Sequence, residues 1–391
     1  LLWCLCPILS SVVNGLGAYD GVSSAMYQSF TWGLPYFVGR VYFSDLKGIN
    51  TLAIAIFVGG LVYVPFCLEE MAMSPQLHRL VYGFHQHSFL QTMRGNGYRP
   101  MVFMQHGLMV AMWMVSALLI GLWLAYSGVL PEGFSRLPRI GKIFAKISLP
   151  LLLVALLVTT VLMKSTGAFV LFLIGMLTLY LSNKFKTALL VWLLICIPPV
   201  YMVARSTGWW TGEGLTNAIS QKFSAERGQS LQFRFDNEKI LVDKALDGSL
   251  FGWGGWNRSR VFDDEGKDIS VTDGLWIITL GTRGIFGLVV LTTVVLLPVL
   301  LLLHRSTADQ WNRREYAAIA AMCILLSLYM IDNLLNSMIN PIFMLFNGGI
   351  CALLARGVPD FSAIEFLPLL EKPTWKTGYL TAAGRRGTRY I

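Results

Sequence analysis

Residues 274–303, GLWIITLGTRGIFGLVVLTTVVLLPVLLLL, decide the fold class of this chain. The run is longer than the roughly 20 residues that a helix needs to cross the hydrocarbon core of a membrane. Other apolar runs of about 18 residues occur elsewhere in the chain. The 391 residues are 55% hydrophobic and only 14% charged, whereas soluble domains carry about 25% charged residues. Because a transmembrane barrel would show short strands of alternating polarity, the sequence predicts an all-α polytopic integral membrane protein.

We expect about nine to eleven transmembrane helices, interrupted by one large polar stretch. The predicted regions are N-terminal transmembrane helices at 1–203 with an outer loop at 69–100, a large extracytoplasmic loop containing short helices at 204–272, C-terminal transmembrane helices at 273–356, and a cytoplasmic tail at 357–391. The chain begins with Leu1 rather than Met, inside an apolar run, so we expect its first span to be clipped at the N-terminus.

Basic residues predict which loops face the cytoplasm, because cytoplasmic loops carry an excess of Lys and Arg. If the tail is inside, counting the spans backwards places the short basic loops inside as well: the turn at 304–314, the pair Lys184 and Lys186, the loop at 130–147 and the segment 40–47. The loops at 69–100 and 204–272 then lie outside. This distribution accounts for the net charge of +9, so the charge does not imply a nucleic-acid partner.

Several cations nevertheless lie on the outer side, against this preference. The candidates for an anion site among them are Arg99, Lys164, Arg227, Arg234 and Arg283. Arg suits phosphate because its planar guanidinium donates parallel hydrogen bonds. A lipid diphosphate carries two phosphates beside a membrane, so several cations at the interface would bind it. The alternative is that the arginines pair with Glu226, Asp236 and Glu238 or contact lipid headgroups.

Acidic residues stand at the ends of two spans. Asp273 comes where the span at 274–303 begins, and a carboxylate at that outer mouth could act as a general base for a sugar hydroxyl. The position also favours a helix N-cap, which Asp forms through its side-chain oxygen, and the two roles are compatible. Glu69 and Glu70 end another span, where a capping or topological role is favoured over catalysis.

The sequence indicates neither a metal nor a cofactor. The six cysteines lie in apolar runs without CxxC spacing, which argues against a zinc site and a disulfide framework. On a helix, His85 and His87 would point to different faces, and we interpret them, together with His106, as histidines of a polar outer loop. The glycines of 252–255 are not followed by the Lys-Ser/Thr of a phosphate-binding loop, so we expect a tight turn there.

Several stretches resemble the O-antigen ligase/polymerase superfamily of bacterial surface polysaccharide assembly. They are the Arg-containing helix from Arg227 to Leu246, GSLFGWG at 248–254, VTDGLWIITLGTRGIFGL at 271–288, LMKSTGAFVLFLIGML at 162–177, and Glu70 followed by Ser74-Pro75. The resemblance covers roughly residues 50–355. The resemblance rests on the order of these stretches along the chain and on the predicted topology more than on any single motif.

The resemblance implies a multi-pass enzyme of the bacterial inner membrane that transfers a glycan from an undecaprenyl-diphosphate-linked donor to a glycan or lipid acceptor. Such an enzyme would be an inverting, metal-independent glycosyltransferase that works beside polysaccharide export or assembly proteins. The resemblance implies that Arg227 and Arg234 bind the diphosphate, with Lys164 and Arg99 in support. Ligases of the family have a His near the end of the large loop, but this chain has none between 107 and 303. Asp273 is the nearest substitute, which favours a polymerase or a ligase with another acceptor.

Two other classes of protein compete with this reading. A transporter or flippase for a polyisoprenoid-linked glycan or another anion would favour charged or broken helices near the midplane and an internal repeat. We see neither, because the ionisable residues stand at span ends. A non-catalytic assembly scaffold would tolerate the loss of any one outer cation.

Overall fold

The computed structural model describes residues 1–94, 97–130, 143–144, 146–222 and 224–356, and in these residues the chain forms helices and no named strand. The predicted fold class is confirmed: the protein is an all-α polytopic membrane protein. The predicted cytoplasmic tail and most of the predicted inner loop at 130–147 lie outside the described residues.

Six described helices are long and apolar enough to cross a membrane. They are α4 (Leu46–Met73), α6 (Gly107–Tyr126), α9 (Thr166–Lys184), α10 (Leu189–Ser206), α13 (Leu275–Arg305) and α14 (Ala317–Leu335). Shorter apolar helices are α1 (Leu2–Val13), α8 (Leu149–Leu162) and α15 (Pro341–Ala355). The expected total of about nine to eleven spans therefore requires the shorter helices to cross as well.

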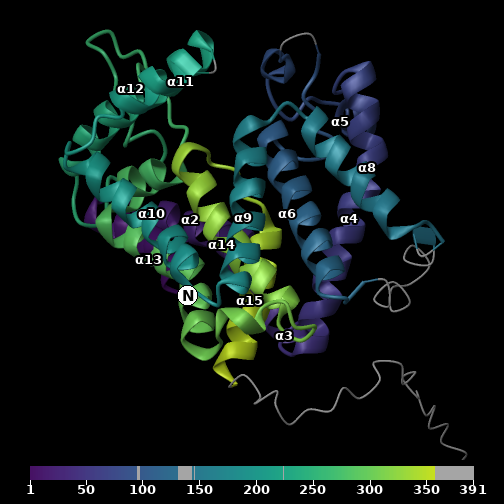
Figure 1. The fold of residues 1–391 in the computed structure, drawn as a ribbon. Coiled ribbons are helices and arrows are strands. Elements are labelled where there is room, and N and C mark those ends of the chain that lie inside the picture. Colours follow the sequence, from purple (N-terminus) through teal and green to yellow (C-terminus); the bar gives the residue numbers. More distant parts are fainter. Residues whose placement is uncertain (95–96, 131–142, 145, 223, 357–391) are drawn as a thin grey trace, which may run out of the picture. The chain divides into compact units, whose positions relative to one another are not determined.

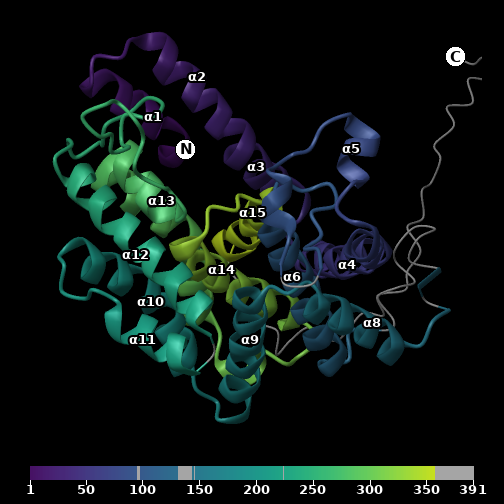
Figure 2. The ribbon, with the colours of Figure 1, turned by 90° about the horizontal axis from the view of Figure 1, so that it is seen from above.

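The core of the bundle is built around α14. In the apolar 18-residue stretch of α14, 89% of the residues are buried, against 39% in the corresponding stretches of α9, α10 and α13. Helix α14 contacts α4, α6, α9, α10, α13 and α15. Figure 2 shows α14 and α15 between the side that holds α10 to α13 and the side that holds α4 to α8. The helices at the periphery of the bundle expose Leu, Val and Ile, which is the expected surface for helices in contact with lipid.

The N-terminal helices reach this core through α3. Helix α2 (Ala18–Gln28) continues through a π turn, η1 (Ser29–Gly33), into α3 (Leu34–Tyr42), which crosses α15. A Cβ atom on Gly39 would lie 1.7 Å from the carbonyl oxygen of Leu345, and one on Gly348 would lie 1.9 Å from that of Tyr36. The glycines therefore allow the two backbones to touch, as small residues do between membrane helices.

One end of the bundle carries the polar elements, and we call it the outer face. These elements are α5 (Leu77–Tyr82), the short turn η2 (Phe89–Thr92), α11 (Glu213–Lys222) and α12 (Ala225–Leu246). In Figure 1 they lie at the top, above the spans. Helix α12 contacts both α10 and α13, so the large loop is joined to the bundle rather than being a free domain.

Helix α13 is broken at Gly284, whose φ of 65° and ψ of −167° are not helical. The predicted span at 274–303 is present as a candidate membrane helix, but it contains a break that the sequence analysis did not predict. A loop at 249–254 fills the break: the N–H groups of Trp253 and Gly254 donate to the carbonyls of Gly281 (2.9 Å) and Thr282 (3.0 Å), and the N–H of Phe286 donates to Leu250 (3.2 Å). Backbone groups that a broken helix would leave unpaired in the membrane are thus satisfied.

Glycine makes this contact possible. A Cβ atom on Gly252 would lie 2.4 Å from the backbone nitrogen of Gly284, and Gly252, Gly254 and Gly255 all have positive φ angles. About 20 residues, the length of one crossing, separate Gly284 from the charged inner end of α13 at Arg305. The break consequently lies at the outer edge of the span and not at its midplane.

Candidate functional site

Glu70 fixes the loop that carries the first part of the site. It lies in the last turn of α4 and is 1% exposed. One carboxylate oxygen accepts from the N–H of Leu77 (3.1 Å), and the other accepts from Met101 (2.8 Å) and Val102 (2.7 Å). Both ends of the outer loop are therefore attached to α4 through one side chain.

Arg99 projects from this fixed loop and is buried, with 6% exposure. It lies over Gly107, where a Cβ atom would be 2.4 Å from its Cδ. Its Nε and Nη1 atoms are buried and have no hydrogen-bond partner in the part of the chain that the structure describes. Burial, and then the positive charges of Arg94 and Arg234, lower the pKa of Arg99 to about 10, so the guanidinium stays charged at neutral pH. Burying a charge with unpaired donors costs free energy unless an acceptor compensates it, so Arg99 is a candidate for binding an anion.

Lys164 contacts the same loop from across the bundle. It precedes α9 and adopts a positive φ of 54°. Its Nζ donates to the backbone oxygen of Arg94 (3.1 Å), 70 residues earlier in the chain. We call Arg94, Arg99, Lys164 and Arg234 the outer cation cluster.

His106 adjoins the cluster as the N-cap of α6. Its Nδ1 accepts from the N–H of Leu108 (3.0 Å), so the proton is on Nε2, which faces the side-chain oxygen of Gln91 (3.3 Å). Burial first, and then the charges of His87, Arg99, Arg94 and Arg234, lower the pKa of His106 to about 4. The ring is therefore neutral at physiological pH and adds no charge to the cluster.

The large loop brings Arg234 and Asp273 together. Arg234 lies on α12, and its Nε is 3.5 Å from a carboxylate oxygen of Asp273. The N-cap of α13 is Gly274, without a side-chain cap, so the interpretation of Asp273 as a helix cap is wrong. Burial raises the pKa of Asp273, and the charge of Arg234 opposes this. Arg234 also interacts electrostatically with Arg99 and with Asp332 near the end of α14.

Arg227 is the predicted site residue that stands apart. It is exposed in the first turn of α12, where its N–H donates to the cap residue Ser224. Seven residues, or about 10 Å along the helix axis, separate it from Arg234. The structure thus brings Arg99, Arg234 and Asp273 into one region with Lys164 on its edge, and leaves Arg227 at its rim.

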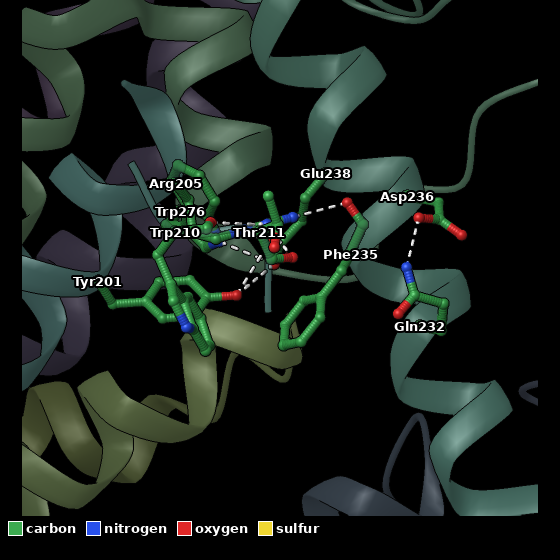
Figure 3. Close-up of polar contacts among 9 residues, drawn as sticks. All are labelled: Tyr201, Arg205, Trp210, Thr211, Gln232, Phe235, Asp236, Glu238 and Trp276. Atoms are coloured by element: carbon green, nitrogen blue, oxygen red, sulfur yellow. Dashed lines mark hydrogen bonds and ion pairs between the residues drawn. The ribbon is translucent and has the colours of Figure 1, made fainter. Parts of the chain in front are cut away.

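A buried ion pair holds α12 in place (Figure 3). The Nε of Arg205, at the end of α10, lies 3.0 Å from Glu238 on α12, and both side chains are 6% exposed. Glu238 also accepts from Tyr201 (2.8 Å) and from Trp276 of α13 (3.3 Å). Burial raises the pKa of Glu238, while Tyr201 and Arg205 lower it. Because Arg234 is one turn away, this ion pair fixes the arginine of the site.

Two of the three carboxylates proposed as alternative partners for the outer arginines contact other side chains. Glu238 pairs with Arg205, and Asp236 accepts from Gln232 (2.7 Å) on the same helix (Figure 3). Sequence reasoning did not single out Arg94, His106 and Asp332 as site residues. Arg94 carried the same signal as Arg99, a cation in an outer loop, whereas nothing in the sequence relates Asp332 to Arg234.

The arrangement can hold an anion at the outer ends of the membrane helices with a carboxylate beside it. No group of three or more His, Cys, Asp or Glu side chains suited to a metal ion occurs among the described residues. Cations next to a carboxylate can bind a phosphate, stabilise its charge as it leaves, and accept a proton.

Glu238→Gln should destabilise the protein by about 3–5 kcal/mol, because it leaves the buried guanidinium of Arg205 without its counter-charge. Thermal unfolding in detergent, followed by tryptophan fluorescence, measures the loss. Glu226→Gln removes an exposed carboxylate from the first turn of the same helix and is the matched control. Equal unfolding temperatures for the two variants would contradict the role of this ion pair.

His106 should make stability depend on pH between about 6.5 and 4. Its folded pKa is lower than the unfolded value, so the unfolded chain binds the extra proton in this window. Stability is then complete above pH 6.5 and falls by up to about 3 kcal/mol as the pH approaches 4. His106→Asn keeps a capping side chain and should flatten this slope in unfolding experiments. An unchanged slope would show that His106 is not the group responsible.

No protein-family model matches the sequence, and no curated protein matches it either. The resemblance to O-antigen ligases and polymerases therefore rests on the motifs quoted above. What the chain does has to be argued from its site: an incompletely paired cation cluster beside a carboxylate, at the outer face of a helical membrane bundle.

Proposed function

We propose that the protein is a membrane glycosyltransferase that polymerises or ligates glycans on the periplasmic face of the bacterial inner membrane. Its donor would be a glycan linked to undecaprenyl diphosphate, and its acceptor the hydroxyl of another glycan or lipid. The observation that carries the proposal is Arg99, a buried guanidinium with two nitrogens that lack a partner among the described residues. It interacts electrostatically with Arg234, which is itself paired with Asp273.

A lipid diphosphate matches the charge and the place of this site. The cluster has more cations than carboxylates, and an Arg fork can bind phosphate oxygens with parallel hydrogen bonds. It lies where α4 ends and α6, α9 and α13 begin, so a lipid in the bilayer could reach it. Arg99 and Arg234 would hold the two phosphates, with Lys164 and Arg94 at the edge. Arg227 would contact the glycan or the distal charge.

The reaction follows from the placement of Asp273. An acceptor hydroxyl oxygen attacks the anomeric carbon of the donor sugar, and its proton passes to the Asp273 carboxylate. The bond from the anomeric carbon to the phosphate oxygen breaks, and the lipid diphosphate leaves with the electron pair. One displacement inverts the configuration at this carbon. Arg99 and Arg234 stabilise the charge that develops on the diphosphate, a task that a metal ion performs in other enzymes.

The histidines of the outer loop do not displace Asp273 as the base. His106 lies close to Arg99 and Arg234, but both its ring nitrogens have partners. His87 stacks edge-on against it at 4.9 Å and is exposed, with one nitrogen accepting from the N–H of Ser88. Among the described residues, the ion pair of Asp273 involves one carboxylate oxygen, and the other oxygen could accept a proton. This favours the polymerase, or a ligase with an acceptor other than a lipid A core.

A flippase or transporter for the same lipid is the second candidate. The break in α13 at Gly284, next to Arg283, favours it because transporters bind substrates at discontinuous helices. Two observations weigh on the other side: the loop at 249–254 already fills the break, and the break lies at the outer edge of the span. The buried, incompletely paired arginine Arg99 lies at the outer face, which suits a reaction on that face better than passage through the bundle.

Arg99→Ala and Arg234→Ala should each lower polysaccharide formation at least about a hundredfold, the usual effect of removing one charge-stabilising donor. Single lipid-linked units should accumulate on the outer leaflet, measured by labelling from outside intact cells. Lys239→Ala, which removes an exposed cation one turn further along α12, is the control. Accumulation on the cytoplasmic leaflet would identify a flippase. Full activity of both variants at normal protein level would mean that the loop is structural.

Asp273→Asn should lower kcat about 10²–10⁴-fold with little change in the KM for the lipid donor, because it removes the proton acceptor and keeps the shape. In the wild-type enzyme, burial raises the pKa of Asp273, so the acidic limb of the pH–rate profile should lie above the ordinary range for Asp. Arg234→Gln should move this limb further up, since the opposing charge is gone. Asp332→Asn is the comparison: a larger fall in kcat there would transfer the role of base to Asp332.

A further inference from the structure

A second group of donors lies on the other side of α13, where it meets α1 and α2. The Nη2 atom of Arg283 donates to the side-chain oxygen of Gln28 (2.9 Å). The guanidinium carbon lies 4.3 Å from the centre of the Trp3 ring. Gln28 and Trp3 are 2% and 3% exposed, so the guanidinium is held between two buried side chains.

This group has donors but lacks an acceptor. The oxygen of Gln28 is occupied by Arg283, and its amide nitrogen is buried without a partner. Exchanging the two amide atoms would place an NH₂ group against the guanidinium, so the orientation is fixed. The indole nitrogen of Trp3 is also buried and unpartnered. Within the described residues, the structure records no ion pair for Arg283.

Two glycines shape the place that Arg283 occupies. Gly284 allows the chain to leave the helical path directly after it. Gly287 has no side chain where Arg283 lies, and a Cβ atom there would be 2.3 Å from the Cβ of Arg283. The arginine thus lies along the break, against α1 and α2. An exposed arginine on a helix surface would need neither glycine.

The length of α13 places Arg283 at the outer boundary of the hydrocarbon if the inner boundary is at Arg305. About 20 residues separate it from the inner end of α13, which is the length of one crossing. Ile285 and Val289 follow Arg283 toward the membrane and are 50% and 58% exposed. Met26 and Phe30, which lie two residues before and after Gln28 in the sequence, are 55% and 64% exposed. Apolar side chains on the lipid-facing surface, below a cation at the boundary, match the two parts of a lipid with an anionic headgroup.

We propose that Arg283, Gln28 and Trp3 form a binding site for the phosphate of a membrane lipid at the outer face. The phosphate oxygens would accept from the guanidinium, the Gln28 amide and the Trp3 indole, while the hydrocarbon chain runs along Ile285 and Val289. The site is separate from the outer cation cluster, and the proposal does not depend on the reaction assigned to that cluster. A phospholipid and a polyisoprenyl phosphate both offer the required chemistry.

Native mass spectrometry of the purified protein tests the site with three probes: phosphatidylglycerol, undecaprenyl phosphate and diacylglycerol, which lacks the phosphate. The wild-type chain should retain at least one of the phosphate lipids and not diacylglycerol. Trp3→Phe keeps the ring under the guanidinium but removes one donor, and it should weaken retention about tenfold. Arg283→Gln should weaken it about a hundredfold. Arg305→Gln removes an exposed cation from the inner end of the same helix and should change nothing.

Each outcome of this experiment either supports the lipid site or overturns it. Tighter retention of either phosphate lipid identifies the source and supports the site. Equal retention of all probes, or retention that neither Trp3→Phe nor Arg283→Gln alters, would overturn it. If Arg283→Gln fails to fold, Trp3→Phe alone decides the result. Sugar transfer is not measured here, so a failure of the proposed reaction cannot be mistaken for a failure of this site.

Discussion

The buried ion pair between Arg205 and Glu238 joins the polar outer elements to the membrane bundle. It links the end of α10 to the middle of α12, and through Trp276 it also reaches the first turn of α13. Two charges in such a place are tolerated because they meet each other and several further hydrogen bonds. The positions of Arg234 and Asp273 follow from it, since one lies a turn away on α12 and the other directly before α13. Glu70 does the same for the loop of Arg99 from the opposite side of the bundle.

A comparison of three arginines shows what distinguishes structure from function here. Arg205 uses all three of its nitrogens: Nε on Glu238, Nη1 on Trp210 and Thr211, and Nη2 on Phe235. Arg99 is buried to a similar degree but leaves Nε and Nη1 without partners. Arg283 donates to Gln28, whose amide nitrogen is buried without a partner among the described residues, and it lies over the ring of Trp3. The completed network of Arg205 is typical of a structural role, whereas the open donors of Arg99 and Arg283 are the basis for proposing ligands at these two places.

The helical fold could be predicted from the sequence, because the length of the apolar runs determines the helices. The distribution of charge predicts an outer position for Arg99, Lys164 and Arg234, but it does not predict which of them lie near one another. The partner of Glu238 could not be predicted, because a contact between α10 and α12 leaves no trace in local spacing. The break in α13 was missed for a similar reason: a Gly after an Arg reads as part of an apolar run, and only the loop at 249–254 makes the interruption stable. Asp273 looked like a helix cap because it stands at a helix start, yet Gly274 takes that place.

The loop that fills the break also has consequences for how the protein is made. Ser10 of α1 donates to the carbonyl of Phe251, and Asn14 donates to that of Gly252, contacts that join residues 241 and 238 positions apart. Helix α1 is therefore synthesised long before the partners of its polar side chains exist. Those groups have to remain solvated near the membrane surface until the ribosome has produced most of the chain. Docking of this loop onto α1 and α13 can be completed only after Phe286 has been made, and α14 and α15 join the bundle later still.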